Sequence, residues 1–268
     1  MIRLFTLVSS CFCLVLPAQS FEKYQAHRAV YEVEFDKAAS ESRLVGVDGV
    51  WVIETNGAYC TGYNVDYRFI TRLSYDGGRT DVLDTNGKSF ESGDGVAFNF
   101  SSVTKQNETI IEDNKGVASK RDDGVLVQSS RPVETEVTFE EKVLFPTEHM
   151  SKLIEEAKAG TRFTENPVYE GLEEAESYYA VSAIIGKEQE QTSESGAIHQ
   201  VLDEKAVRRW PVSLSYFKTD KLGDSVPEWQ TRFIMYENGI ARAFKIDYGS
   251  FAIKANLMEL ELLENESC

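Results

Sequence analysis

Alternation of apolar and polar side chains with a period of two is the feature that most restricts how this chain folds. In the stretch HRAVYEVEF, one face carries Ala29, Tyr31, Val33 and Phe35, and the other carries Arg28, Glu32 and Glu34. Such alternation is typical of strands that have one buried and one solvated face. It predicts a mainly β fold built from antiparallel strands.

Glycine-containing turn signals separate the alternating runs. A long run, GYNVDYRFITRLSY, starts at Gly62, and the signals are YDGGRT, DTNGKS, SGDG, DNKG and RDDG. The strand-like alternation resumes after residue 207. Within this part, Glu237-Asn238-Gly239 marks a tight hairpin. The pattern predicts a meander of short strands from residue 25 to about residue 143, followed by further strands in the C-terminal part.

One segment, FPTEHMSKLIEEAKAG, has the period of a helix instead. Thr147 is the expected N-cap and Gly160 the expected end. Four apolar residues fall on one stripe: Met150, Leu153, Ile154 and Ala157. A single amphipathic helix among strands is expected to plug or cover the sheet.

The first 20 residues read as a secretory signal peptide. Arg3 precedes an apolar stretch, and small residues at Ala18 and Ser20 suit cleavage before Phe21. The alternative is a lipid attachment at Cys11, but the apolar core before it is short. Beyond residue 20 no uncharged run approaches the roughly 18 residues of a membrane-spanning helix, so we expect no transmembrane anchor.

A chain cleaved after residue 20 keeps 248 residues, which suits a single β-rich domain over residues 21–268. The polar segment 188–204 is expected to be a loop within this domain, because strand-like alternation resumes after it. The shortened chain has 27 basic and 44 acidic side chains, a net charge of −17. A charge of this sign disfavours nucleic acid and anionic lipid surfaces as partners.

Cleavage would also remove Cys11 and Cys13 and leave Cys60 and Cys268. In an exported protein a lone pair of cysteines favours a disulfide. Two separate thiols are the alternative. A catalytic cysteine is a further one, although no histidine stands beside either residue in the sequence.

The sequence offers no catalytic motif. His27, His149 and His199 are scattered, and a nucleophile elbow, a phosphate loop and a dinucleotide fingerprint are absent. Carboxylates are so abundant that a pair at glycosidase spacing would be uninformative. We therefore expect no enzyme, no metal and no cofactor, with a cell-wall hydrolase as the residual alternative.

Arg242 is the unusual residue of IARAFKIDY, because alternation places it with Ile240, Phe244 and Ile246. A charge on an apolar face must be paired, reach solvent or line a pocket. Pairing with a carboxylate and contact with a ligand are both open. For the three tryptophans, burial in the hydrophobic core and service as a platform for stacking a sugar ring are likewise both open: Trp51, Trp210 and Trp229.

Several stretches together resemble a known family. They are AHRAVYEVEF, YCTGYNVDYRFITR, FPTEHMSKLIEEAKAG, WPVSLSYFKTD, YENGIARAFKIDYGSF and the terminal cysteine. In this order they are similar to the cell envelope integrity protein EipB family, exported proteins of alphaproteobacteria. The resemblance implies a periplasmic location, a sheet coiled into a spiral or open barrel-like shape around a helix, a Cys60–Cys268 disulfide, and a role in envelope integrity under stress.

The chain departs from the family at YEGLEEAESYY, where Glu170 to Ser177 replace a glycine-flanked, Asp-rich turn. The family's use of that turn therefore does not transfer. We expect a monomer that contacts an envelope protein or lipid component. The alternative is a carrier that holds lipid or lipoprotein acyl chains in an apolar concavity, which requires that the helix leave part of the concavity unfilled.

Overall fold

The computed structural model describes residues 24–171, 178–189, 202, 207–219 and 226–268. In these residues 14 strands form one sheet. The strands are β1 (His27–Ala38), β2 (Leu44–Ala58), β3 (Gly62–Tyr75), β4 (Thr80–Ser92), β5 (Ala97–Gln106), β6 (Thr109–Arg121), β7 (Gly124–Arg131), β8 (Thr135–Phe139), β9 (Phe163–Val168), β10 (Tyr179–Ile185), β11 (Arg209–Lys218), β12 (Trp229–Tyr236), β13 (Ala241–Asp247) and β14 (Phe251–Leu262). The predicted mainly β class is confirmed.

The sheet is antiparallel throughout and remains open. Its order runs from β8 back to β1, continues through β14, and then runs back to β9. The two edge strands, β8 and β9, are consecutive in the chain and are joined through the helix α1 (Pro146–Ala159). This order confirms the predicted meander, and it places the first and last strands side by side in the middle of the sheet.

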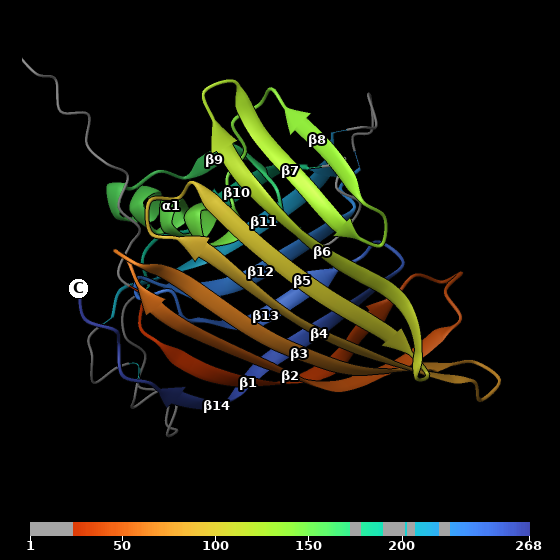
Figure 1. Cartoon of the computed structure of the whole chain (residues 1–268). Coiled ribbons are helices and arrows are strands. Elements are labelled where there is room, and N and C mark those ends of the chain that lie inside the picture. Colours follow the sequence, from red (N-terminus) through yellow and green to blue (C-terminus); the bar gives the residue numbers. More distant parts are fainter. Residues whose placement is uncertain (1–23, 172–177, 190–201, 203–206, 220–225) are drawn as a thin grey trace, which may run out of the picture.

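The sheet coils until its two edges approach each other (Figure 1). Leu144, which follows β8, forms a parallel bridge with Val168 of β9. The rings of Phe139 in β8 and Tyr169 after β9 have centroids 5.7 Å apart. Right-handed strand twist accumulates over long strands and curls a large sheet in this way. The expected spiral or open barrel-like shape with an enclosed helix is confirmed.

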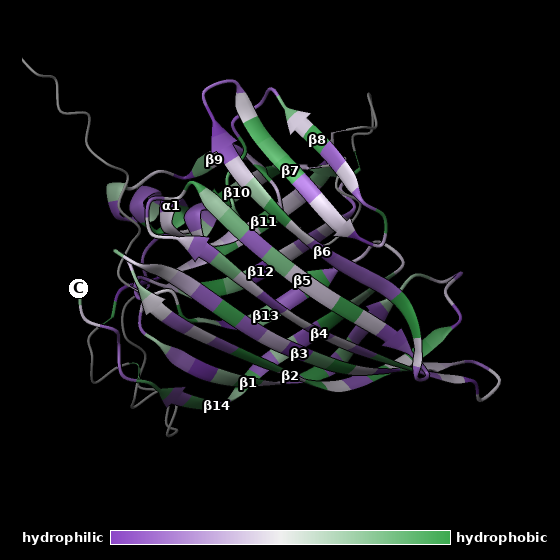
Figure 2. Cartoon of the chain, in the orientation of Figure 1, coloured by the Kyte–Doolittle hydropathy of each residue, from purple (hydrophilic) through white to green (hydrophobic). Residues whose placement is uncertain are grey.

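The pleat separates an inner face, which points into the coil, from an outer face. Ala29, Tyr31 and Val33 of β1 are buried inside, while Glu32 and Glu34 are exposed outside. Figure 2 shows the resulting alternation of hydrophobic and hydrophilic residues along the strands. The face assignment that alternation predicted for β1 is confirmed.

Two of the five predicted turn signals are wrong. YDGGRT, SGDG and RDDG lie at turns, but DTNGKS and DNKG lie within β4 and β6. A Cβ atom at Gly87 would lie 2.3 Å from the ring of Tyr67, and one at Gly116 would lie 2.5 Å from Phe100. These glycines therefore make room for aromatic rings on the inner face, a use of strand glycine that resembles a turn signal in sequence.

Helix α1 ends as predicted but does not begin as predicted. Gly160 adopts a left-handed conformation and its N–H donates to the Ala157 carbonyl. The N-cap, however, is Phe145, followed by Pro146 at the first helical position. Thr147 therefore lies inside the first turn and does not cap the helix.

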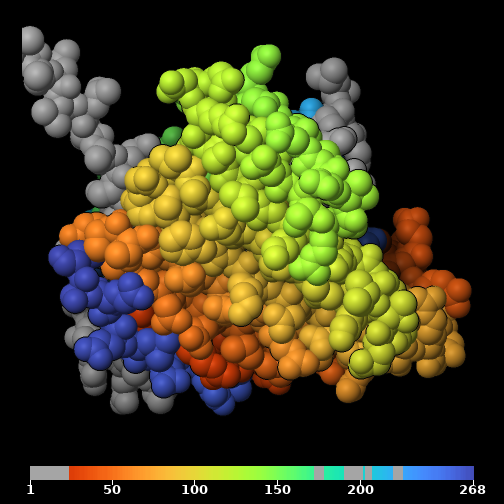
Figure 3. Space-filling view, viewed as in Figure 1, coloured from red at the N-terminus to blue at the C-terminus, as the bar shows by residue number. Residues whose placement is uncertain are grey.

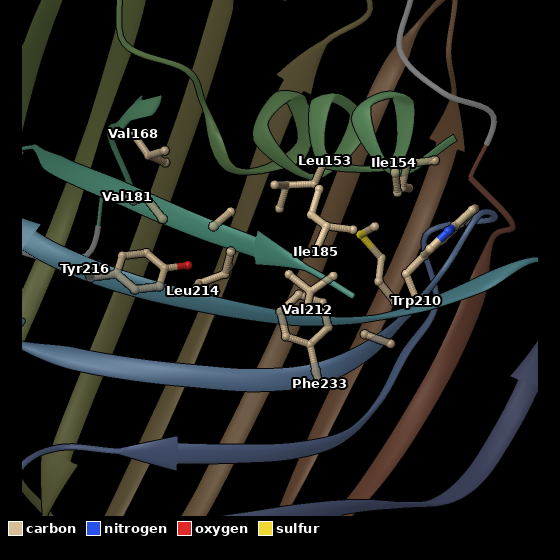
Figure 4. Close-up of a cluster of buried hydrophobic side chains, with 14 of the residues drawn as sticks. Leu153, Ile154, Val168, Val181, Ile185, Trp210, Val212, Leu214, Tyr216 and Phe233 are labelled. Atoms are coloured by element: carbon tan, nitrogen blue, oxygen red, sulfur yellow. The ribbon is translucent and has the colours of Figure 1, made fainter. Parts of the chain in front are cut away.

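The predicted apolar stripe of α1 faces into the coil. Leu153 and Ile154 are fully buried, and Figure 4 shows them directed at Ile185 and Trp210 on the inner face. Burying each such side chain contributes about 1.5–3 kcal/mol. Helix α1 thus plugs one part of the coil, chiefly against β10, β11 and β12.

Three predicted segments lie wholly or largely outside the described residues. They are the signal peptide at 1–20, most of the polar loop at 188–204, and residues 172–177 of the altered turn.

Candidate functional site inside the coiled sheet

Two groups of aromatic side chains line the inner face. On one wall, Phe69 lies with its ring centroid 4.8 Å from that of Trp51 and 5.0 Å from that of Tyr67. On the other wall, Trp229 stacks on Tyr216 with centroids 4.4 Å apart. Both groups follow from inward-pointing alternate positions on paired strands, β2 with β3 and β11 with β12.

These rings are incompletely covered. Trp51, Tyr67, Phe69 and Trp229 are half-buried although they point inward. Burial nevertheless raises the pKa of Tyr67 to about 12. We call the part of the inner face that carries these two aromatic groups the inner chamber.

Glu170 brings a carboxyl group to the inner chamber. The chain enters the coil here: a Cβ atom at the next residue, Gly171, would lie 2.7 Å from the ring of Phe100. Desolvation raises the pKa of Glu170 to about 7. Burial is the main cause of the raised pKa values of Tyr67 and Tyr216, and the charge of Glu170 adds to it. Glu170 is itself half-buried.

A second inward carboxylate, Glu91 of β4, holds the start of α1. It is only 1% exposed. Its Oε1 accepts the Thr147 N–H at 2.5 Å and its Oε2 accepts the Glu148 N–H at 3.1 Å. These amides have no partner within the helix, and a carboxylate also suits the positive end of the helix dipole. Desolvation outweighs these bonds and raises the pKa of Glu91 to about 7.

Glu148 completes the start of the helix. Its Oε2 accepts the backbone N–H of Phe145 at 3.2 Å and also pairs with the ammonium group of Lys120 in β6. Helix α1 is thus tied through side chains to β4 and β6 as well as packed on β10, β11 and β12.

The predicted disulfide is present. Cys60 and Cys268 are bonded across a sequence separation of 208, and both residues are exposed. Cys60 lies in the turn between β2 and β3. Figure 3 shows the C-terminal residues in blue against the segment around residue 60.

The last residues close the end of the coil at which the disulfide lies. The Asn265 side chain accepts the Ala26 N–H at 2.6 Å, and the Leu263 N–H donates to the Ala26 carbonyl at 2.8 Å. A cavity of about 310 Å³ beside the disulfide has Tyr24 and Tyr63 in its lining. The Tyr24 hydroxyl donates to the Thr147 carbonyl of α1 at 2.8 Å.

Arg242 does not share a face with Phe244 and Ile246, so that expectation is wrong. Ala243 adopts a φ of 57°, and a bulge interrupts the pairing of β12 with β13 at this point. Arg242 therefore lies opposite Ile234, and its Nε donates to the Tyr236 hydroxyl at 2.8 Å. It does not border the inner chamber.

The other candidates are dispersed. Trp210 is 1% exposed and belongs to the core, whereas Trp51 and Trp229 border the chamber. His27 and His149 are buried, and His199 lies outside the described residues. No group of three or more potential metal ligands occurs among the residues that the structure describes.

Sequence reasoning missed Glu91. The inward positions of β4 include Thr85, Gly87 and Ser89. Alternation of apolar and polar residues therefore did not indicate that this face of the strand is buried. Glu170 was noted only as a departure from the family turn. A single sequence holds no signal for its inward position, because Phe100, which it lies near, is 70 residues away in the chain.

Across the described part of the chain, the one helix is too short and too polar to cross a membrane. A family model described as EipB-like matches residues 18–264. The cell envelope integrity protein EipB of Brucella abortus (strain 2308) is 31% identical over 247 residues, which are 92% of this chain and 87% of that protein.

A solved structure has a similar fold. It is a crystal structure from Brucella abortus described as a beta-barrel-like protein of a domain of unknown function, with a TM-score of 0.83 and 30% sequence identity. The match covers 91% of this chain and 100% of that chain. Both sequence and fold are thus similar over nearly the whole length.

Proposed function

This chain belongs to the EipB-like family, and on that premise we propose that it is an exported periplasmic protein that supports the integrity of the cell envelope. The observation that carries the proposal is the match to a cell envelope integrity protein over 92% of the chain. The leader-like residues 1–20 and the Cys60–Cys268 disulfide support an oxidising compartment outside the cytoplasm.

The proposed role is contact with another envelope component, without catalysis. The inner chamber presents aromatic rings and one isolated carboxyl, Glu170. A hydrolase site would need a nucleophile or a second polar group placed to act with it. The chain acts as a monomer in this proposal.

Deletion of the gene tests the proposed role. We expect the deletion strain to lose resistance to detergent and to show altered envelope morphology, and a plasmid copy of the full chain to restore both. A deletion strain with unchanged detergent survival and unchanged morphology would contradict the proposal.

The half-buried aromatic walls favour a second candidate function, that of a periplasmic carrier. Helix α1 packs against β10, β11 and β12, and its buried cluster does not include Trp51 or Phe69. The helix therefore leaves part of the apolar inner face unfilled, which is the condition that a carrier of lipid or acyl chains requires.

Native mass spectrometry of the protein purified from the periplasm without detergent tests the carrier. A carrier would retain added mass of the size of a lipid, and this mass would fall when Trp51 and Phe69 are both replaced by alanine. A bare monomer in every preparation would reject the carrier and leave the contact role standing.

A further inference from the structure

A row of positively charged side chains crosses three neighbouring strands on the outer face of the sheet. Arg232 of β12 is directly opposite Lys245 of β13, and Lys245 is directly opposite Lys254 of β14. All three point away from the coil, because the residue that follows each of them packs in a cluster of the inner face. Like charges in directly opposite positions destabilise a sheet, so this row needs negative charge beside it.

The chain supplies that negative charge for the two lysines only. Asp36 of β1 pairs with the Nζ atom of Lys245 at 2.5 Å and with that of Lys254 at 2.7 Å. Glu34 of β1 is also directly opposite Lys254. Arg232 is exposed and forms no ion pair or hydrogen bond with any residue that the structure describes. Its guanidinium group is therefore available to an external anion.

Cations on the far part of the outer face are arranged differently. Across β3 and β4, Arg68 pairs with Asp84 at 2.9 Å and Lys88 pairs with Asp66 at 3.2 Å. Such alternation is easy to achieve in a chain with 44 acidic and 28 basic side chains. Three cations in succession, the last of them without a carboxylate, are thus an exception on this protein.

The same row continues from Arg232 to the free edge of the sheet and becomes apolar. Arg232 is opposite Ser213 of β11, Ser213 is opposite Ile184 of β10, and Ile184 is opposite Phe163 of β9. Ile184 is 60% exposed and Phe163 is 62% exposed. Neighbouring strands are about 4.8 Å apart, so Ile184 lies about 10 Å from Arg232. The row thus offers an apolar contact at one end and positive charge at the other.

This combination suits an acidic protein segment better than an anionic membrane. The net charge of −17 that remains after cleavage of residues 1–20 would be repelled by a whole anionic surface. A protein segment presents its few carboxylates locally, and an apolar side chain beside them can reach the edge strands. In a helix, a distance of about 10 Å corresponds to about seven residues, or two turns.

We propose that the row from Phe163 to Lys254 is a docking surface for an acidic segment of a partner protein. Arg232 is the counter-ion of a carboxylate of that segment, and Phe163 and Ile184 contact one of its apolar side chains. This inference rests on the contact role proposed above and adds to it the surface and the chemistry of the partner.

NMR titration of the isotope-labelled protein with two synthetic helical peptides tests the surface. The first carries three glutamates in its first two turns and two leucines two turns later, and the second has glutamines in place of the glutamates. We expect the first peptide to shift the amide resonances of β10 to β14 and to bind about tenfold more tightly than the second. Arg232→Glu should abolish this preference. Phe163→Ser/Ile184→Ser should weaken the binding of both peptides about fivefold.

The matched control is Arg28→Glu, which makes the same change in net charge on the outer face of β1, where Arg28 is opposite Glu54 and Glu261. It should keep the preference for the glutamate peptide. Arg232, Ile184 and Phe163 are exposed, so their variants should melt at the temperature of the wild type.

Three results would overturn the docking surface: no shift with the glutamate peptide, equal affinity for the two peptides, or an equal loss of preference in Arg28→Glu and Arg232→Glu. None of them would touch the envelope role, because the deletion strain tests that role separately.

Discussion

At the scale of single residues, Glu91 couples the sheet to the helix. Its carboxylate accepts the backbone N–H groups of Thr147 and Glu148 where the helix cannot supply acceptors. Because Glu91 is 1% exposed, water cannot replace it without rearrangement of the core. The start of α1 is therefore fixed by a residue more than 50 positions earlier in the chain.

Glu91→Ala should destabilise the protein by about 2–4 kcal/mol, since it leaves two buried amide donors without an acceptor. The measurement is urea unfolding followed by circular dichroism. Glu32→Ala, on the exposed face of β1, is the matched control and should shift the free energy of unfolding by less than about 0.5 kcal/mol. Equal effects of the two variants would contradict the assigned contact.

Glu91 also predicts a pH dependence of stability. Its pKa is raised from 4.5 to about 7 by burial, so its stabilising contribution is complete below pH 4.5 and is lost as pH rises through 7. Glu91→Gln does not titrate. The free energy of unfolding of the wild type relative to this variant should fall by up to about 3 kcal/mol between pH 4.5 and pH 8. A difference that stays constant with pH would rule this out.

The residue scale is where sequence reasoning was weakest. Alternation assigned Arg242 to the wrong face, because the positive φ of Ala243 and the bulge beside it left no recognisable mark in the sequence. Glu91 was missed because the nearest inward residues of β4, Thr85, Gly87 and Ser89, are small or polar. Both failures arise where neighbouring strands, and not local periodicity, decide what a position contacts.

At the scale of elements, periodicity succeeded where one face is clearly apolar. It identified β1 and α1 with their buried faces. It failed at Gly87 and Gly116, which admit the rings of Tyr67 and Phe100 within strands. A glycine beside polar residues is ambiguous between a turn and a close approach until the partner strand is known.

Leu153→Ala tests whether α1 is a packed plug. Leu153 is fully buried in the cluster with Trp210 and Val212, so its truncation should cost about 2–5 kcal/mol in the free energy of unfolding. Glu155→Ala, on the exposed side of the same helix, provides the comparison and should be nearly neutral. A small effect of Leu153→Ala would mean that the helix is not anchored in the coil as described.

At the scale of the whole molecule, the order of the sheet could not be predicted from the sequence alone. Local patterns identify neighbours within the meander, but the pairing of β1 with β14 joins residues more than 200 positions apart, as at His27 and Leu262. The coiled shape was predicted from the family resemblance instead. The disulfide between Cys60 and Cys268 reinforces the same long-range closure.

Reduction of the disulfide should lower stability. In the chain-entropy model, a link across 208 positions contributes at most about 5 kcal/mol, so we expect the melting temperature to fall by up to about 10–20 °C in reductant. The Cys60→Ser/Cys268→Ser double variant should melt at the lower temperature with or without reductant. A melting temperature of the wild type that reductant leaves unchanged would show that the bond does not stabilise the fold.

The central claim is that this chain acts on the envelope from the periplasmic side. The most direct measurement is detergent survival of a deletion strain that carries either the full chain or a chain without residues 2–20. We predict that only the full chain restores survival, although both are produced in equal amounts. Equal restoration by the chain that lacks these residues would contradict the claim.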